Sequence, residues 1–186
     1  MGGAAYKDVI DTPSRQFDTH AVSTGPPEIR IVPATREDIP LILSFIRRLA
    51  EYERLAHACV ATEDGIRRTL FENPVAAEVL FAYAGEAPVG FALFFHNYST
   101  FLAERGLFLE DLFVVPEARG KRIGYALFSA LAEIALSRNC GRMEWSVLKW
   151  NKLAIDFYIR VGAEPLDGWT TYRLTGESLR RLAQKS

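Results

Sequence analysis

Cysteine is scarce in this chain: only Cys59 and Cys140 occur among 186 residues. Two widely separated cysteines predict neither a disulfide scaffold nor a cysteine-based metal site, so reduced thiols are the default. An excess of charge of either sign is also missing, because 22 basic residues meet 23 acidic ones. The sequence therefore gives no electrostatic reason to expect nucleic acid or an anionic membrane as a partner.

Long apolar runs and export features are absent as well. No apolar stretch reaches the length of about 20 residues that a transmembrane helix needs, and the first residues lack the apolar core of a secretory signal. The chain begins Met1-Gly2, but Tyr6 stands where the myristoylation pattern requires Ser or Thr. These features favour a cytoplasmic protein without a membrane partner.

The composition is that of a globular protein, with 49% hydrophobic and 24% charged residues. Residues 1–27 are polar and end in Gly25-Pro26-Pro27, which predicts a disordered extension; an appended remnant or a partner-binding arm are the alternatives. Residues 28–186 are long enough to form a single domain with a sizeable core.

The periodicity of the apolar residues predicts the order β-α-α-β-β-β-α-β-α-β, followed by a polar C-terminal helix. Three consecutive strands favour antiparallel pairing, whereas the later strand-helix-strand unit favours a parallel pair with a right-handed crossover. The predicted fold class is therefore α/β, with a mixed sheet and helices on both faces. The expected strands span 29–32, 78–83, 89–95, 107–115, 142–148 and 169–174, and the expected helices span about 35–53, 62–71, 123–138 and 154–161.

A short basic turn, Ala-Arg-Gly-Lys-Arg-Ile-Gly at 118–124, joins the fourth expected strand to the third expected helix. Such a turn leaves several backbone N–H groups unpaired at the positive end of a helix. Arg119, Lys121 and Arg122 add three charges within four residues. The combination predicts a site for a phosphate or a pyrophosphate. The alternative is an ordinary strand-to-helix connection with solvated basic residues.

Several separated motifs occur in a fixed order around this turn. They read Leu-Ala-Glu-Tyr-Glu at 49–53, Leu-Glu-Asp-Leu-Phe-Val at 109–114, Arg-Gly at 119–120, Ile-Gly at 123–124, Trp-Asn at 150–151, Asp-Phe-Tyr at 156–158 and Gly-Ala at 162–163. Over residues 29–183 the chain resembles the GNAT family of acetyl-CoA-dependent N-acetyltransferases. More narrowly, it is similar to the diamine (spermidine/spermine) and thialysine N-acetyltransferase branch. One position departs from the family's Arg-Gly-x-Gly-x-Gly turn, because Arg122 replaces the middle glycine.

The resemblance implies a GNAT fold whose central parallel strands splay apart to admit acetyl-CoA, with no metal. It implies a homodimer with substrate pockets near its interface. Backbone groups of 112–114 would bind the pantetheine arm, and the turn would hold the pyrophosphate, with the Arg122 N–H facing the phosphate and its side chain swung clear or clamped over it. The implied cofactor-binding residues are Leu112, Phe113, Val114, Arg119, Gly120, Lys121, Arg122, Ile123, Gly124, Tyr125, Asn151, Ala154 and Tyr158.

The resemblance also implies an acid for the departing thiolate. It gives Tyr158 this role, although a tyrosine on an apolar helix face is commonly a core residue. A thiol with a pKa near 8.5 is already a fair leaving group, so the loss of Tyr158 should slow the reaction without necessarily abolishing it. Asn151 begins the same helix, where asparagine is a favoured N-cap, and the family places the matching residue against CoA. These two roles are compatible.

Glu110 is the candidate general base. A carboxylate within an apolar strand is costly to bury unless it is paired or in use. A primary amine with a pKa near 10.4 is protonated at pH 7, and only its neutral form attacks a thioester. Glu110 could bind the ammonium and relay its proton through water, with a structural salt bridge or an edge position as the alternative. Asp111 follows Glu110, so simple alternation predicts that it points to the opposite face and adds electrostatics or structure.

The amine site is implied by resemblance alone. Tyr52 and Glu53 would bind the substrate, and Glu144 and Asp167 would contribute more weakly; a helix terminus, a surface position and a turn are the alternatives. Residues 96–101 lack a carboxylate, which favours a smaller amine over a dedicated spermine site, and His96 there is more simply a structural residue than a base.

The predicted function is direct acetyl transfer from acetyl-CoA to a primary amine of a small molecule. The rival functions are a protein or peptide lysine acetyltransferase and a non-catalytic CoA-binding module. A protein or peptide lysine acetyltransferase needs an open groove. The bulky Phe101 and Trp169, expected near the pocket, would argue against such a groove. Retention of Glu110, Asn151 and Tyr158 together argues against the second.

Overall fold

The computed structural model describes residues 28–184, and the extension predicted for residues 1–27 lies outside them. Five strands form one sheet in the order β1-β2-β3-β4-β5. Neighbouring strands are antiparallel from β1 to β4, and β5 is parallel to β4. The mixed sheet and the parallel final pair confirm the predicted fold class. The strands are β1 (Ile29–Pro33), β2 (Glu78–Ala84), β3 (Ala87–Ser99), β4 (Glu104–Val114) and β5 (Arg142–Trp145).

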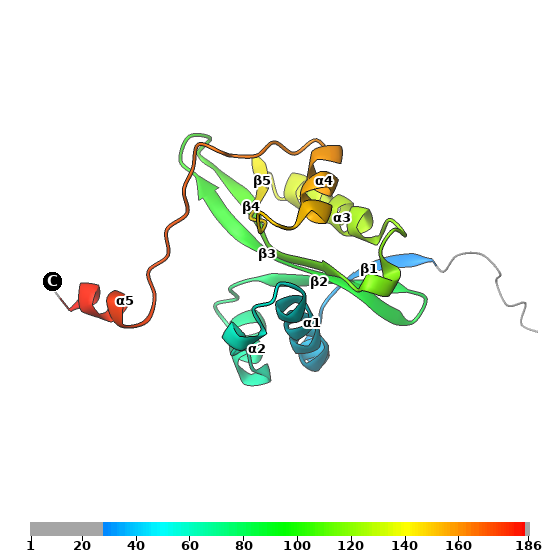
Figure 1. Cartoon of the computed structure of the whole chain (residues 1–186), viewed down its shortest axis with the longest axis horizontal. Helices are drawn as coiled ribbons and strands as arrows, with labels where there is room; N and C mark the ends of the chain where they lie inside the picture. The colour runs from blue at the N-terminus through cyan, green and yellow to red at the C-terminus, as the bar shows by residue number, and fades with distance from the viewer. Residues whose placement is uncertain (1–27, 185–186) are drawn as a thin grey trace, which may run out of the picture.

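Helices cover both faces of the sheet (Figure 1). α1 (Ile39–Tyr52) and α2 (Glu63–Leu70) lie on one face, and α3 (Ile123–Ser137) and α4 (Lys152–Arg160) lie on the other. α5 (Gly176–Ala183) lies apart from both layers. Three short 3-10 turns complete the order, at Arg36–Asp38, Ala56–Ala58 and Pro116–Ala118. In the part of the chain that the structure describes, no helix is both long and apolar enough to cross a membrane.

Capping and amphipathic spacing explain why the first two helices form where they do. The backbone N–H of Thr35 donates to the Asp38 carboxylate at 2.8 Å, which fixes the entry into α1. The Thr62 hydroxyl accepts from the Gly65 N–H at 3.1 Å and so caps α2. α1 buries Ile42, Phe45 and Leu49 along one stripe, which is the pattern of a helix packed on a sheet.

The core on the α1 side is built from aromatic rings. Phe45 of α1 lies 5.6 Å from Phe81 and 5.3 Å from Phe91, measured between ring centroids. On the other face, α3 buries Ile123, Leu127 and Leu131. Helices therefore bury both faces at the middle of the sheet. The cleft described below lies instead at the ends of β4 and β5.

A β-bulge interrupts β4. Leu109 pairs with Phe94 and Asp111 pairs with Leu93, so Glu110 is an extra residue without a partner on β3. A bulge of this kind sets two residues against one and re-aims the side chains around it. The alternation that predicted opposite faces for Glu110 and Asp111 therefore breaks at this point, and it is Leu109 and Asp111 that face opposite sides.

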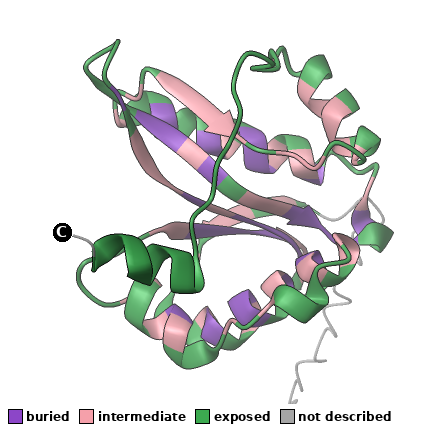
Figure 2. Cartoon of the chain, turned by 60° about the vertical axis from the view of Figure 1, so that its left-hand side comes forward, coloured by how far each residue is buried: buried purple, intermediate pink, exposed green. Residues whose placement is uncertain are grey.

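The predicted strand at 169–174 does not form, and the predicted strand at 142–148 ends early, at Trp145. Residues 163–175 follow α4 on an irregular path that leads to α5 (Figure 2). Trp169 is 79% exposed and Tyr172 is 91% exposed. The alternating pattern suits a strand, but a strand also needs a partner, and this segment pairs with no strand among residues 28–184. The polar C-terminal helix is confirmed as α5.

Candidate active site

The site is a cavity of about 450 Å³ between the end of α1, the last half of β4, the turn before α3, and α4. It exists because β4 and β5 pair only from Gly106 to Leu109 and from Arg142 to Trp145. Beyond Leu109 strand β4 continues, while the chain after Trp145 turns away and lines the cavity with residues 146–148. The two parallel strands therefore splay, as the resemblance implied.

Splaying leaves one edge of β4 without a strand partner beyond Leu109. β3 pairs with the other edge as far as Val114. On that edge, the backbone groups of β4 that point toward the cavity have no strand to pair with, although the Val114 carbonyl accepts from Arg119 Nε. Buried backbone groups require partners, so those left unpaired are available to a ligand. An extended chain bearing amide groups would satisfy them, which fits the pantetheine arm of acetyl-CoA.

The turn before α3 has the conformation of an anion site. Gly120 has φ +77° and Arg122, the N-cap of α3, has φ 63° and ψ 10°. Such left-handed residues before a helix direct successive N–H groups into one concavity. Arg122 thus adopts the backbone that a glycine would take at this position, at a cost of about 1 kcal/mol. Its guanidinium lies over the ring of Tyr125 at 5.4 Å, and Tyr125 itself is half-exposed.

Arg119 is engaged with the protein. Its Nε donates to the Val114 carbonyl at 3.0 Å, and its guanidinium lies 4.4 Å from the centre of the Tyr52 ring. A cation stacked on an aromatic face and bonded to a backbone carbonyl is held in place. Arg119 therefore links the turn to the end of α1.

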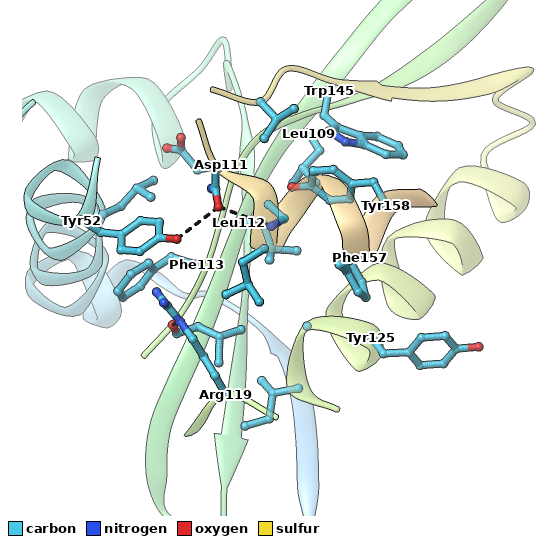
Figure 3. Close-up of a pocket in the computed structure, with 18 of the residues that line it drawn as sticks. Tyr52, Leu109, Asp111, Leu112, Phe113, Arg119, Tyr125, Trp145, Phe157 and Tyr158 are labelled. Carbon is cyan, nitrogen blue, oxygen red and sulfur yellow. Dashed lines mark hydrogen bonds between the residues drawn. The ribbon is translucent and has the colours of Figure 1, made fainter. Parts of the chain in front are cut away.

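Tyr158 points into the cavity from α4 (Figure 3). Its ring packs against Phe128 at 5.4 Å, Trp145 at 5.0 Å and Phe157 at 5.6 Å. Burial, reinforced by the charge of Glu53, raises the pKa of the Tyr158 hydroxyl to about 12. The hydroxyl thus stays protonated at neutral pH, which a proton donor requires.

Three carboxylates line the same cavity: Glu53, Glu110 and Asp111. Burial, followed by the charges of Glu110 and Glu53, raises the pKa of Asp111 to about 6. Burial also raises the pKa of Glu53. The charges of Glu110 and Glu53 act on Asp111 because the three carboxylates lie close together, and such a cluster attracts a cation. No group of His, Cys, Asp and Glu placed to hold a metal occurs between residues 28 and 184.

Asn151 joins the two sides of the cleft. Its Oδ1 accepts from the Ala154 N–H at 3.3 Å, so it caps α4 as predicted, and it also accepts from the Tyr52 hydroxyl at 3.2 Å. Tyr52 ends α1 and Asn151 begins α4. The hydrogen bond therefore spans the cavity between two helices that cover opposite faces of the sheet.

The structure gathers most of the predicted site residues around this one cavity. Lys121, Glu144 and Asp167 are the exceptions, since they do not line it. Glu144 accepts from Asn97 Nδ2 at 3.0 Å and pairs with Arg142 Nε at 2.9 Å. Asp167 is exposed in the irregular segment after α4. The roles of these three in ligand binding remain predictions.

Some lining residues were missed. Ser146, Val147 and Leu148 line the cavity although the pattern placed them in a strand. The expected splay of the two parallel strands could have indicated them. A strand that separates from its neighbour ends where the pairing ends, and the residues after that point line the opening. Phe101 is 94% exposed, and neither it nor Trp169 lines the cavity. The expected argument from these two bulky residues against an open groove is therefore wrong.

Comparison with known proteins matches this architecture to a family. The profile of the Acetyltransferase (GNAT) family covers residues 46–163. The chain belongs to the GNAT acetyltransferase family, and it is an acetyl-CoA-dependent N-acetyltransferase.

Similar curated proteins narrow the comparison. A thialysine N-epsilon-acetyltransferase of Bos taurus is 39% identical over 168 residues, covering 84% of this chain and 98% of the relative. An L-ornithine N5-acetyltransferase of Arabidopsis thaliana is 33% identical over 198 residues, covering 82% and 87%. Among solved structures, an integron cassette protein from the mobile metagenome of V. cholerae aligns with a TM-score of 0.72 at 26% identity, covering 84% and 98%.

Proposed function

We propose that this chain transfers acetyl from acetyl-CoA to the primary amine of a small molecule, of the diamine, polyamine, or lysine- or thialysine-like kind. The observation that carries the proposal is the cluster of Glu53, Glu110 and Asp111 in the cavity that also holds Tyr158. A cationic amine is drawn to such a cluster. The names of the thialysine and L-ornithine relatives support this class of substrate.

The proposed reaction is direct attack, without a covalent acyl-enzyme. The substrate reaches the cluster as an ammonium, and releasing its proton at pH 7 costs about 4.6 kcal/mol for a pKa near 10.4. Glu110 accepts that proton through water, and Asp111 and Glu53 hold the cation beside it. The neutral nitrogen then forms a bond to the thioester carbonyl carbon.

Collapse of this adduct breaks the carbon–sulfur bond. The electron pair leaves with the sulfur, and Tyr158 donates its proton to the thiolate. The nitrogen loses its second proton to the carboxylate side of the cavity, and the products are the amide and CoA. Backbone N–H groups of β4 beyond its pairing with β5, where no strand binds them, would polarise the carbonyl.

A thiol-release assay with acetyl-CoA tests the proposal. The panel comprises thialysine, lysine, ornithine, diamines, polyamines and lysine-bearing peptides, and small amines should turn over fastest. Peptides that outpace every small amine would favour a protein lysine acetyltransferase. Tight binding of acetyl-CoA without turnover on the whole panel would instead favour the CoA-binding module.

The proposal includes a homodimer. In the described part of the chain, the outer edge of β5 has no strand beside it. Residues 164–183, here called the C-terminal arm, expose Trp169, Tyr172 and Leu174. The strand-like segment of one copy could pair with the outer edge of β5 in a second copy, and the reverse, which would join two chains. Sedimentation analysis should give twice the chain mass, and Tyr172→Glu should shift the equilibrium toward the monomer.

A further inference from the structure

The hydrogen bond between Tyr52 and Asn151 gives Tyr52 a role different from the predicted one. Its hydroxyl donates to Asn151 Oδ1 at 3.2 Å across the cavity. The same oxygen accepts from the Ala154 N–H at 3.3 Å, in the first turn of α4. This one side-chain oxygen thus accepts hydrogen bonds both from the first turn of α4 and from the last residue of α1.

The Tyr52 ring is held on several sides. The Arg119 guanidinium lies 4.4 Å from the ring centre, and Arg119 is itself bonded to the Val114 carbonyl. The rings of Phe113 and Trp150 lie at 6.1 Å and 5.8 Å. A ring packed in this way is not free to reorient toward a bound substrate. Its hydroxyl is already directed at Asn151.

α4 depends on contacts of this kind. It is a helix of nine residues without a fully buried side chain, and helices of this length are marginal by themselves. Its start follows the irregular residues 146–151. Tyr158 lies about two helical turns beyond Asn151 and therefore on the same side of α4. A shift of the Asn151 cap moves the Tyr158 hydroxyl with it.

We propose that Tyr52 is a positioning residue, which acts through Asn151 on α4 and so places the Tyr158 hydroxyl for proton transfer. The inference rests on the proposed function, because it takes Tyr158 as the acid. It gives Tyr52 a different role from its neighbour Glu53, which lines the same cavity and is proposed to hold the cationic amine. It also connects the turn before α3 to the acid, by way of Arg119 and Tyr52.

The decisive variant is Tyr52→Phe, which keeps the ring and its stacking on Arg119 and removes only the hydroxyl. The kcat should fall about five-fold, the scale of one lost hydrogen bond, while the KM values for amine and acetyl-CoA stay within two-fold. In a Tyr158→Phe background the same change should cost nothing more. Tyr83→Phe on β2, outside the cavity, is the matched control and should leave both constants unchanged.

Rescue at Asn151 completes the experiment. Asn151→Asp keeps an oxygen that accepts from both Tyr52 and Ala154, and it should retain most of the kcat. Asn151→Ala removes both bonds, and adding Tyr52→Phe to it should lower the kcat no further. Additive losses in the Tyr52→Phe/Tyr158→Phe pair, or a raised amine KM with an unchanged kcat, would overturn the inference alone. Full activity of Tyr158→Phe, or a wild-type chain without turnover, would overturn the proposed function and the inference with it.

Discussion

Leu109 and Asp111 stand two residues apart on β4 yet face opposite sides of the sheet, because the bulge at Glu110 sits between them. In a regular strand these two residues would share a face. The bulge turns Asp111 toward the side where α1 ends, and it leaves Glu110 outside the ladder. The β-bulge thus allows the adjacent carboxylates of Glu110 and Asp111 to line one cavity.

Glu110→Gln should impair the proton relay. At pH 7 the rate of thiol release with a small amine should fall about 100-fold, the lower range of a general-base contribution. The loss should shrink toward pH 10, since more of the amine is then neutral without help. Glu86→Gln, on the exposed turn between β2 and β3, is the control. A loss that is equal at every pH would contradict the relay.

Asp111→Asn should stabilise the fold at neutral pH while lowering activity. Burial raises the pKa of Asp111 from 3.8 to about 6, so the native state disfavours its ionised form. The contribution of Asp111 to the free energy of unfolding is fully present below pH 4. It is lost as the pH rises from 4 through 6, and the loss is at most about 3 kcal/mol. Thermal unfolding should therefore show a higher Tm for the variant at pH 8 and no difference at pH 4. A difference independent of pH would exclude ionisation as its cause.

Tyr158 sets the alkaline behaviour of the reaction. Because its pKa lies near 12, the wild-type kcat should hold from pH 8 to about pH 10.5. Tyr158→Phe should lower kcat about ten-fold to 100-fold, at or below the lower limit of the usual acid contribution, since a thiolate leaves readily. Steady-state thiol release across this range measures both. A wild-type kcat that declines near pH 9 would show that a different group is the acid.

Arg122→Gly should stabilise the turn. Arg122 has φ 63°, where an L-residue pays about 1 kcal/mol and glycine does not; the greater freedom of glycine in the unfolded chain offsets part of the gain. Chemical denaturation should show a gain of about 0.5 kcal/mol. Lys121→Gly, next to it and outside the left-handed region, should instead destabilise. Acetyl-CoA affinity should change less than about three-fold in Arg122→Gly, because the N–H groups remain.

Much of the fold could be predicted from local pattern. The spacing of Ile39, Ile42, Ile46 and Leu49 predicted α1, and Thr62 predicted the start of α2, because caps and periodicity act within a few residues. The site residues were found because motifs along the chain resemble a family. Most of them line one cavity.

Other features depend on contacts between distant segments. Tyr52 and Asn151 are 99 residues apart, and neither residue's neighbours indicate their hydrogen bond. The pattern at 169–174 resembles a strand, but a strand forms only where the segment pairs with a neighbouring strand, which the local sequence does not indicate. The bulge at Glu110 depends on the register with β3, which alternation within β4 cannot indicate.

The engagement of Arg119 has a consequence for how this turn can vary between proteins. Arg119 is bound to Val114 and stacked on Tyr52, Lys121 does not line the cavity, and Arg122 lies over Tyr125. The proposed pyrophosphate site thus relies on main-chain dipoles, which a change of side chain does not delete. Such a site requires a backbone conformation, and different residue types can adopt that conformation. Arginine at a position where the family has glycine is therefore compatible with the same site.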